Sequence, residues 1–187
     1  MNATTVAWVV GVGVALYFIL KRGSSVTVGQ TTIPQLPGVG GIVQTVSLMR
    51  TMVNAVIADP LIRRQAVRAS DHCERGNSRC AAHALGEWVR MRMKYVPDPL
   101  NHEHLTSPAV IAKAIEEGKR VYGDCDDMAM YVAALAKSIG LQPTLEVVGR
   151  DKSFHHVYTT VNGVPLDPTV PQGVRPFKAK RHLSLKV

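Results

Sequence analysis

The hydrophobic pattern of the chain predicts a first soluble helix after residue 41. Apolar residues recur there at the spacing of one helical face, namely Ile42, Val46, Met49, Val53 and Ile57. Asp59-Pro60 ends this helix, and a short helix follows from Leu61 to Ala69. The polar stretch from Asp71 to Arg79 is expected to be a loop.

Two further helices are predicted before residue 120. The spacing of Ala84, Trp88 and Met91 indicates a helix over 80–95, which Pro97 terminates. Ser107-Pro108 then has the residue types of an N-cap and a first helical position, and the helix runs to about residue 117.

The last helix and the strands lie close together in the sequence. Apolar residues from Met128 to Ile139, with Cys125 on the same face, predict a helix buried along one side, and Gly140 ends it. Strands are predicted over 145–148, 156–161 and 164–167, with the last two joined by an Asn162-Gly163 turn. Helices followed by hairpin-linked strands indicate an α+β fold in which helices pack on an antiparallel sheet.

The first 22 residues differ from the rest of the chain. Ala3 to Leu20 carry no charge, and 18 helical residues span roughly 27 Å, enough to cross the hydrocarbon core of a bilayer. A cleaved signal peptide is the alternative, but it would carry its positive charges before the apolar run, whereas Lys21 and Arg22 follow it. We therefore expect a single-pass transmembrane anchor with the domain on the cytoplasmic side, or inside a virion.

This pattern divides the chain into five parts. The transmembrane anchor (1–22) is followed by a flexible linker rich in Gly, Ser, Thr and Pro (23–41). A helical lead-in (42–80) precedes the catalytic domain (81–175), and a basic tail (176–187) completes the chain.

The net charge of the chain limits the kinds of partner that we expect it to bind. A formal net charge of +8 favours contact with anionic surfaces, including acidic lipids. No Phe, Trp or Tyr stands between the basic residues of the tail from Lys178 to Lys186, so we expect no specific nucleic-acid partner. The partners expected are the lipid bilayer and a substrate.

Cys125 is the candidate nucleophile. It stands where a helix begins, and backbone N–H groups at a helix start favour the thiolate and can stabilise an oxyanion. Asp124, Asp126 and Asp127 oppose thiolate formation by their charge, so a histidine partner is needed.

Hairpin geometry selects His156 as that partner. If Asn162-Gly163 is a two-residue turn, Val161 faces Val164, and Tyr158 faces Asp167. Side chains alternate along a strand, which places His156 and Asp167 on one face as diagonal neighbours and points His155 to the other face. Tyr158 shares the face of His156 and is a candidate supporting residue.

Three ordered motifs resemble the transglutaminase-like superfamily. They are the run from Gly123 to Asp127 (GDCDD), the segment His156-Val157-Tyr158, and the segment from Asn162 to Thr169 (NGVPLDPT). The resemblance implies a papain-like fold with Cys125 as nucleophile, His156 as base and Asp167 as the acid that orients it. It implies no cofactor. The expected reaction is attack of Cys125 on a carbonyl, giving an acyl-enzyme that water or an amine releases.

The other two cysteines leave alternatives open. His72, Cys73, Cys80 and His83 suggest a metal site, but paired CxxC spacing is absent, and we expect no metal. A Cys73–Cys80 disulfide would form if the domain faced an oxidising compartment.

The function expected from the sequence is a membrane-anchored thiol enzyme. It would cleave or transfer peptide-type amide bonds in a peptide, a protein or a cell-wall peptide. The alternatives are a catalytically silent structural membrane protein, for example in a membrane-containing virus particle, and a module that binds peptides in the former active-site cleft.

Overall fold

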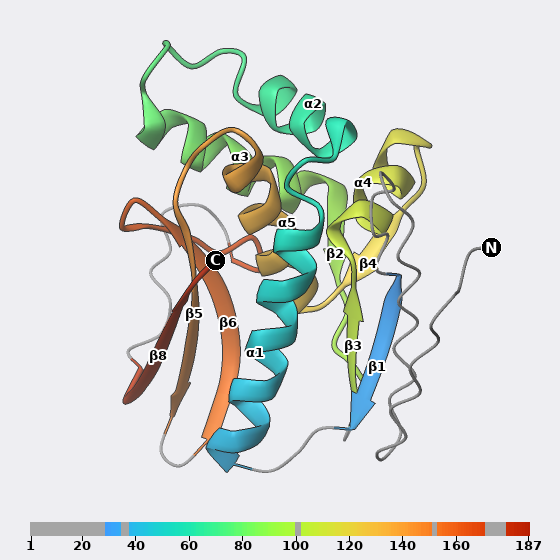
Figure 1. Cartoon of the computed structure of the whole chain (residues 1–187), viewed down its shortest axis with the longest axis vertical. Helices are drawn as coiled ribbons and strands as arrows, with labels where there is room; N and C mark the ends of the chain where they lie inside the picture. Colours follow the sequence, from blue (N-terminus) through green and yellow to red (C-terminus); the bar gives the residue numbers. More distant parts are fainter. Residues whose placement is uncertain (1–28, 35–37, 100–101, 151–152, 171–178) are drawn as a thin grey trace, which may run out of the picture.

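The fold is α+β, with helices on one side of an antiparallel sheet. The computed structural model describes residues 29–34, 38–99, 102–150, 153–170 and 179–187 (Figure 1). In these ranges the helices are α1 (Gly38–Ala55), α2 (Pro60–Ala69), α3 (Ser78–Arg92), α4 (Pro108–Glu116) and α5 (Cys125–Ser138). The predicted helices are confirmed, with boundaries that differ by a few residues.

Capping residues fix where these helices begin. The Asp59 side chain accepts a hydrogen bond from the Leu61 N–H at 2.8 Å, and Pro60 occupies the first helical position of α2. Ser107 caps α4 in the same way, with Pro108 next to it. Each cap satisfies a backbone donor that the helix leaves without a partner. The Ser107-Pro108 helix start is therefore confirmed.

The main sheet contains four antiparallel strands in the order β7-β6-β5-β8. Their bounds are β5 (Pro143–Arg150), β6 (Ser153–Val161), β7 (Val164–Leu166) and β8 (Arg181–Lys186). Two small sheets lie elsewhere: β1 (Gln30–Pro34) pairs with β3 (His102–Thr106), and β2 (Met93–Tyr95) pairs in parallel with β4 (Val121–Gly123). Figure 1 shows α1 between the main sheet and the β1–β3 pair.

The turn between β6 and β7 is the predicted two-residue turn. Asn162 and Gly163 have φ values of 50° and 77°, the left-handed conformations that this tight hairpin turn requires. Val161 pairs with Val164, and Thr159 pairs with Leu166. The predicted register of this hairpin is confirmed.

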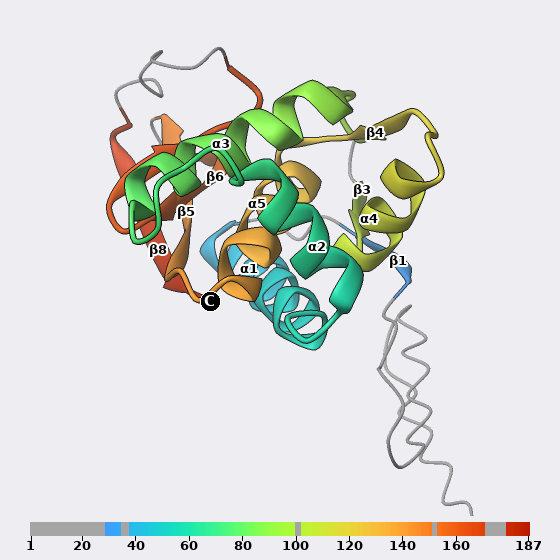
Figure 2. The same cartoon turned by 90° about the horizontal axis from the view of Figure 1, so that it is seen from above.

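Helix α5 is the centre of the core. It contacts the other four helices as well as β5 and β6, and Figure 2 shows it surrounded by them. Its residues from Asp126 to Ala136 are all buried. The expectation of burial along one side is therefore wrong, because the run of alanines and apolar residues leaves no polar face to turn toward solvent.

Three segments differ from the predicted organisation. Residues 30–34 of the predicted flexible linker form β1, and α1 begins at Gly38 within the same segment. Residues 181–186 of the predicted basic tail form β8, whose Leu183 and Leu185 pack against the core. The helix expected over 80–95 ends at Arg92, and residues 93–95 form β2.

The predicted membrane anchor lies outside the described residues. In the part of the chain that the structure describes, no single helix is long and apolar enough to cross a bilayer. Helices α1 and α2 together meet the length and composition criteria, but they are bent by 93° relative to each other.

Gly123 leads into α5 and leaves no room for a side chain. A Cβ at this position would lie 2.7 Å from Asp127 Oδ2 and 2.8 Å from Asp127 Cβ. We predict that Gly123→Ala lowers the free energy of unfolding by about 1–3 kcal/mol, because Asp127 must shift in a packed site. Denaturant unfolding would measure this change.

Gly86→Ala is the matched control. A Cβ on Gly86, inside α3, would meet Leu166 at 3.6 Å, an ordinary van der Waals contact. The alanine also removes the entropy cost of a helical glycine, so this variant should gain about 0.5–1 kcal/mol. Equal effects of the two substitutions would contradict the close approach at Gly123.

Candidate active site

Cys125 is the first residue of α5, as the sequence predicts. The preceding residue, Asp124, is the N-cap, and its Oδ1 accepts hydrogen bonds from the N–H groups of Asp126 at 3.0 Å and Asp127 at 3.4 Å. This cap fixes the first turn of the helix and therefore the position from which the Cys125 side chain extends. Cys125 is the free cysteine among the three in the chain.

The surroundings of Cys125 favour the thiol over the thiolate. Burial raises the pKa of the thiol well above its usual value, and the charges of Asp126 and Asp124 raise it further. The Sγ donates a hydrogen bond to Asp126 Oδ1 at 3.5 Å. A hydrogen bond from the Val157 backbone N–H acts in the opposite direction and lowers this pKa. The predicted opposition of the aspartates to thiolate formation agrees with this arrangement.

His156 and Asp167 are in direct contact. His156 Nε2 and Asp167 Oδ2 lie 2.6 Å apart, and the two side chains are 16% and 4% exposed. Asp167 Oδ1 also accepts hydrogen bonds from the Thr169 N–H at 3.1 Å and the Thr169 hydroxyl at 2.6 Å. Burial acts to raise the pKa of Asp167, but the hydrogen bonds from His156 and Thr169 prevail and hold it below its usual value. The carboxylate is therefore charged beside the imidazole at neutral pH.

A bulge in β6 separates the two adjacent histidines. Val148 pairs with His156 and Gly149 pairs with Phe154, so His155 is the extra residue. The exposed His155 accepts a hydrogen bond from the Arg150 N–H at 2.9 Å. The bulge lies beyond His156 as counted from the hairpin turn, and therefore it does not alter the predicted parity between His156 and Asp167.

Tyr158 lies beside His156, as the alternation along β6 predicts. The two rings stack with centroids 6.2 Å apart and an interplanar angle of 27°. Burial raises the pKa of Tyr158, followed by the charges of Glu146 and Asp167. The contact restricts the orientation of the imidazole from the side of the hairpin turn.

Strand β6 brings these groups to the start of α5. The Thr159 hydroxyl donates to the Ala129 carbonyl at 2.8 Å, which joins the middle of the strand to the first turns of the helix. The Val157 N–H reaches the Cys125 sulfur, and Val157 is the neighbour of His156. The cysteine is thus positioned at the strand that carries the histidine, and the histidine contacts the aspartate.

A group of carboxylates next to Cys125 could not be identified from the sequence. Ligand atoms of Asp98, Glu103 and Asp124 lie within 4.8 Å of one another, as do those of Asp124, Cys125 and Asp126. Such groups can hold a cation, and in its absence they repel one another. Asp98 and Glu103 precede Cys125 by more than 20 residues, in segments whose local pattern does not point to the site.

Tyr95 also lies at the site, although no pattern in the sequence indicated it. It pairs with Gly123 in the parallel β2–β4 contact, two residues before Cys125. Burial raises the pKa of Tyr95, and the charge on Cys125 raises it further. The residue remains 47% exposed, so its ring borders the site on the solvent side.

Comparisons with known proteins give little information on this chain. No protein-family model matches it, and no curated protein matches it. Among solved structures, it is similar to a protein from Cytophaga hutchinsonii described as a "Putative Cysteine Protease", with 16% sequence identity and a TM-score of 0.42. The match covers 84% of this chain and 52% of the other, so the chain spans about half the length of that protein.

The buried aspartates predict that stability falls as the pH rises. Burial, followed by the charge of Asp98, raises the pKa of Asp124 to about 6, and burial raises that of Asp127 to about 8 even though the Thr106 N–H lowers it. In the unfolded chain both groups lose their protons near pH 4. The two protonated aspartates contribute their full share of the folding stability below about pH 4. This share is lost as the pH rises through the pKa values of the folded state, about 6 and about 8.

Thermal unfolding at about pH 5 and about pH 9 measures this effect, and we expect the lower melting temperature at the higher pH. Asp127→Asn is the matched variant, because an amide oxygen can still accept the 2.7 Å hydrogen bond from Thr106. It should flatten the decline by up to about 1.4 kcal/mol per pH unit, the limit for one proton. A decline as steep in Asp127→Asn as in the parent would refute the assignment to Asp127.

Proposed function

We propose that this protein is a thiol enzyme that cleaves or transfers peptide-type amide bonds, with Cys125 as nucleophile, His156 as base and Asp167 as orienting acid. The observation that supports the proposal most strongly is the 2.6 Å contact between His156 and Asp167 on the strand whose Val157 N–H reaches the Cys125 sulfur. The motifs that resemble the transglutaminase-like superfamily supply these same three residues.

The ring nitrogens of His156 have different tasks in this mechanism. Nε2 donates its proton to the Asp167 carboxylate, so Nδ1 is the atom that can take the proton of Cys125. The sulfur attacks the carbonyl carbon, the C–N bond breaks, and the amine leaves with the proton that His156 has accepted. Water or a second amine then attacks the thioester, and the free thiol is restored.

The raised pKa of Cys125 determines when the thiolate forms. The resting site holds a neutral thiol, because burial and the adjacent aspartates disfavour the charged form. Proton transfer to His156 therefore accompanies the attack on the carbonyl. Asp124 already accepts from the N–H groups of Asp126 and Asp127, and the Cys125 N–H is the donor that we assign to the developing oxyanion.

The substrates that suit this chemistry are peptides, proteins and cell-wall peptides. All of them offer an amide carbonyl for acyl transfer, and no part of the proposed mechanism uses a cofactor. The acceptor, water or an amine, decides whether the enzyme acts as a peptidase or as a transferase.

Trapping of the acyl-enzyme tests the proposal without knowledge of the natural substrate. After treatment with p-nitrophenyl acetate, the parent protein should carry one acetyl group on Cys125 that hydroxylamine removes, as measured by intact-protein and peptide mass spectrometry. Cys125→Ala should carry none. The acylation rate of His156→Ala should be lower than that of the parent by at least about 100-fold, because the base that removes the thiol proton is lost.

His155→Ala is the matched control for the base, because it removes an adjacent imidazole whose ring nitrogen contacts the Arg150 N–H. Its acylation rate should remain within about threefold of the parent rate, as expected for a surface substitution. Equal losses from His155→Ala and His156→Ala, or acetylation that persists in Cys125→Ala, would contradict the proposed assignment.

A catalytically silent structural protein is the second candidate. The raised pKa of Cys125 favours it, because a buried thiol next to carboxylates reacts slowly unless a base assists. Iodoacetamide alkylation separates the two candidates. The enzyme predicts that Cys125 reacts faster in the parent than in His156→Ala, whereas a silent scaffold predicts slow reaction at the same rate in both.

We further propose that residues 1–22 anchor the protein to a lipid bilayer. This proposal rests on the uncharged segment from Ala3 to Leu20. The cytoplasmic or virion-interior placement of the domain rests on the positive charges after that segment. The full-length chain should float with phospholipid vesicles in a density gradient and resist extraction by carbonate. A variant that lacks residues 1–22 should remain with the soluble fraction, and co-flotation of both would refute the anchor.

A further inference from the structure

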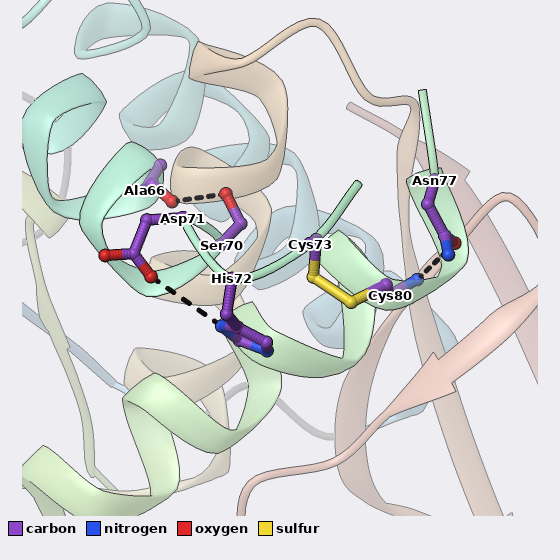
Figure 3. Close-up of a disulfide and its surroundings, with 7 residues drawn as sticks. All are labelled: Ala66, Ser70, Asp71, His72, Cys73, Asn77 and Cys80. Atoms are coloured by element: carbon purple, nitrogen blue, oxygen red, sulfur yellow. Dashed lines mark hydrogen bonds and ion pairs between the residues drawn. A yellow bond between two sulfur atoms is a disulfide. The ribbon is translucent and has the colours of Figure 1, made fainter. Parts of the chain in front are cut away.

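Two cysteines and one histidine, His72, lie together where α2 is followed by α3, and a second histidine, His83, borders the same pocket. Cys73 and Cys80 form a disulfide with their Cα atoms 5.8 Å apart. Cys80 lies in the first turn of α3, where its N–H donates to the side chain of the N-cap residue Asn77 at 3.0 Å. Figure 3 shows the disulfide with His72 beside it. This group belongs to neither the β6–β7 hairpin nor the start of α5.

His72 lies within coordinating distance of both sulfurs. A ring nitrogen of His72 lies within 4.8 Å of the Cys73 and Cys80 Sγ atoms, so all three can reach one metal ion once the bond between the sulfurs is broken. His72 Nδ1 also lies 3.7 Å from Asp71 Oδ1.

His83, on the next turn of α3, is the residue available as a fourth ligand. It follows Cys80 by three residues, so both side chains lie on the same side of the helix. Together with His72, they line one pocket of about 300 Å³, which Glu87 also borders. His83 is outside the group whose ligand atoms lie within 4.8 Å of one another, so its side chain has to turn into this pocket to reach the metal ion.

Two thiolates and two imidazoles form a tetrahedral donor set that Zn²⁺ prefers. We propose that the reduced protein binds one Zn²⁺ ion through His72, Cys73, Cys80 and His83, and that this metal site and the disulfide are alternative states of the same residues. The disulfide uses both sulfurs and excludes the metal. Reduction makes the two sulfurs available, and they need to separate only within the loop from residue 73 to residue 80.

The conversion is balanced by a thiol reductant. Two thiols of the reductant become one disulfide, while the Cys73–Cys80 bond takes up two electrons and two protons to give two thiols. Binding of Zn²⁺ then releases those two protons, because the ligands are thiolates. The metal ion itself is neither oxidised nor reduced.

The two states suit compartments of different redox potential. In an oxidising compartment the disulfide joins the start of α3 to the preceding turn, and in a reducing cytosol the metal would make the same connection. The α2–α3 segment therefore keeps a covalent or coordinate link on either side of a membrane.

Cobalt binding to the full-length chain tests the proposal directly. Cys125→Ala serves as the parent, because it removes the free cysteine, whose sulfur could otherwise also bind Co²⁺. After reduction and removal of the reductant without oxygen, it should bind one equivalent of Co²⁺. The expected signals are the visible d–d bands of a tetrahedral ion and the near-ultraviolet thiolate-to-cobalt band, and one equivalent of Zn²⁺ should abolish both. The oxidised protein should show neither.

Single variants on this background identify the ligands. His72→Asn and His83→Asn should each weaken Co²⁺ binding by at least about tenfold. His182→Asn, in β8 and paired with Glu146, should leave it unchanged. Circular dichroism of each variant would establish that it is folded. The proposal is overturned if the reduced protein gives no tetrahedral spectrum, or if both histidine variants bind as tightly as their parent.

Discussion

The burial of α5 on all sides is the constraint on which the arrangement of the site depends. A helix that is surrounded by four others and by β5 and β6 cannot rotate or slide, so its first residue occupies a fixed position. The hydrogen bond from the Thr159 hydroxyl to the Ala129 carbonyl fixes the position of β6 along the axis of this helix. As a result, Cys125 lies against Val157, and His156 follows directly from the path of the same strand.

The same burial creates the electrostatic problem of the site. Asp124, Asp126 and Asp127 stand at the start of a helix, where carboxylates are favourable, but burial raises the pKa of all three. The nearby Cys125 thiol is kept neutral by burial and by two of these aspartates. Asp167 differs, since hydrogen bonds hold its pKa low and keep it charged next to His156. The site therefore combines a neutral thiol at Cys125 with a charged carboxylate beside His156.

Local chemistry in the sequence was sufficient to predict the hairpin and several helix starts, because Asn162-Gly163 and Ser107-Pro108 determine structure within a few residues. The contact of His156 with Asp167 followed from the alternation of side chains along the strands of this hairpin. The complete burial of α5 could not be predicted, since alanines such as Ala133 suit a helix in any surroundings. Strand β8 was missed because its basic residues obscured the alternation of Leu183 and Leu185. The approach of Glu103 to Asp126 depends on tertiary folding alone.

If Asp167 acts on Cys125 through His156, the two residues are energetically coupled, and a kinetic double-mutant cycle measures that coupling. Acylation rates would be measured for the parent, Asp167→Asn, His156→Ala and the double variant, with folding verified for each. We expect Asp167→Asn to slow acylation when His156 is present and to have no further effect when His156 is alanine. Independent, multiplicative losses from the two substitutions would contradict this coupling.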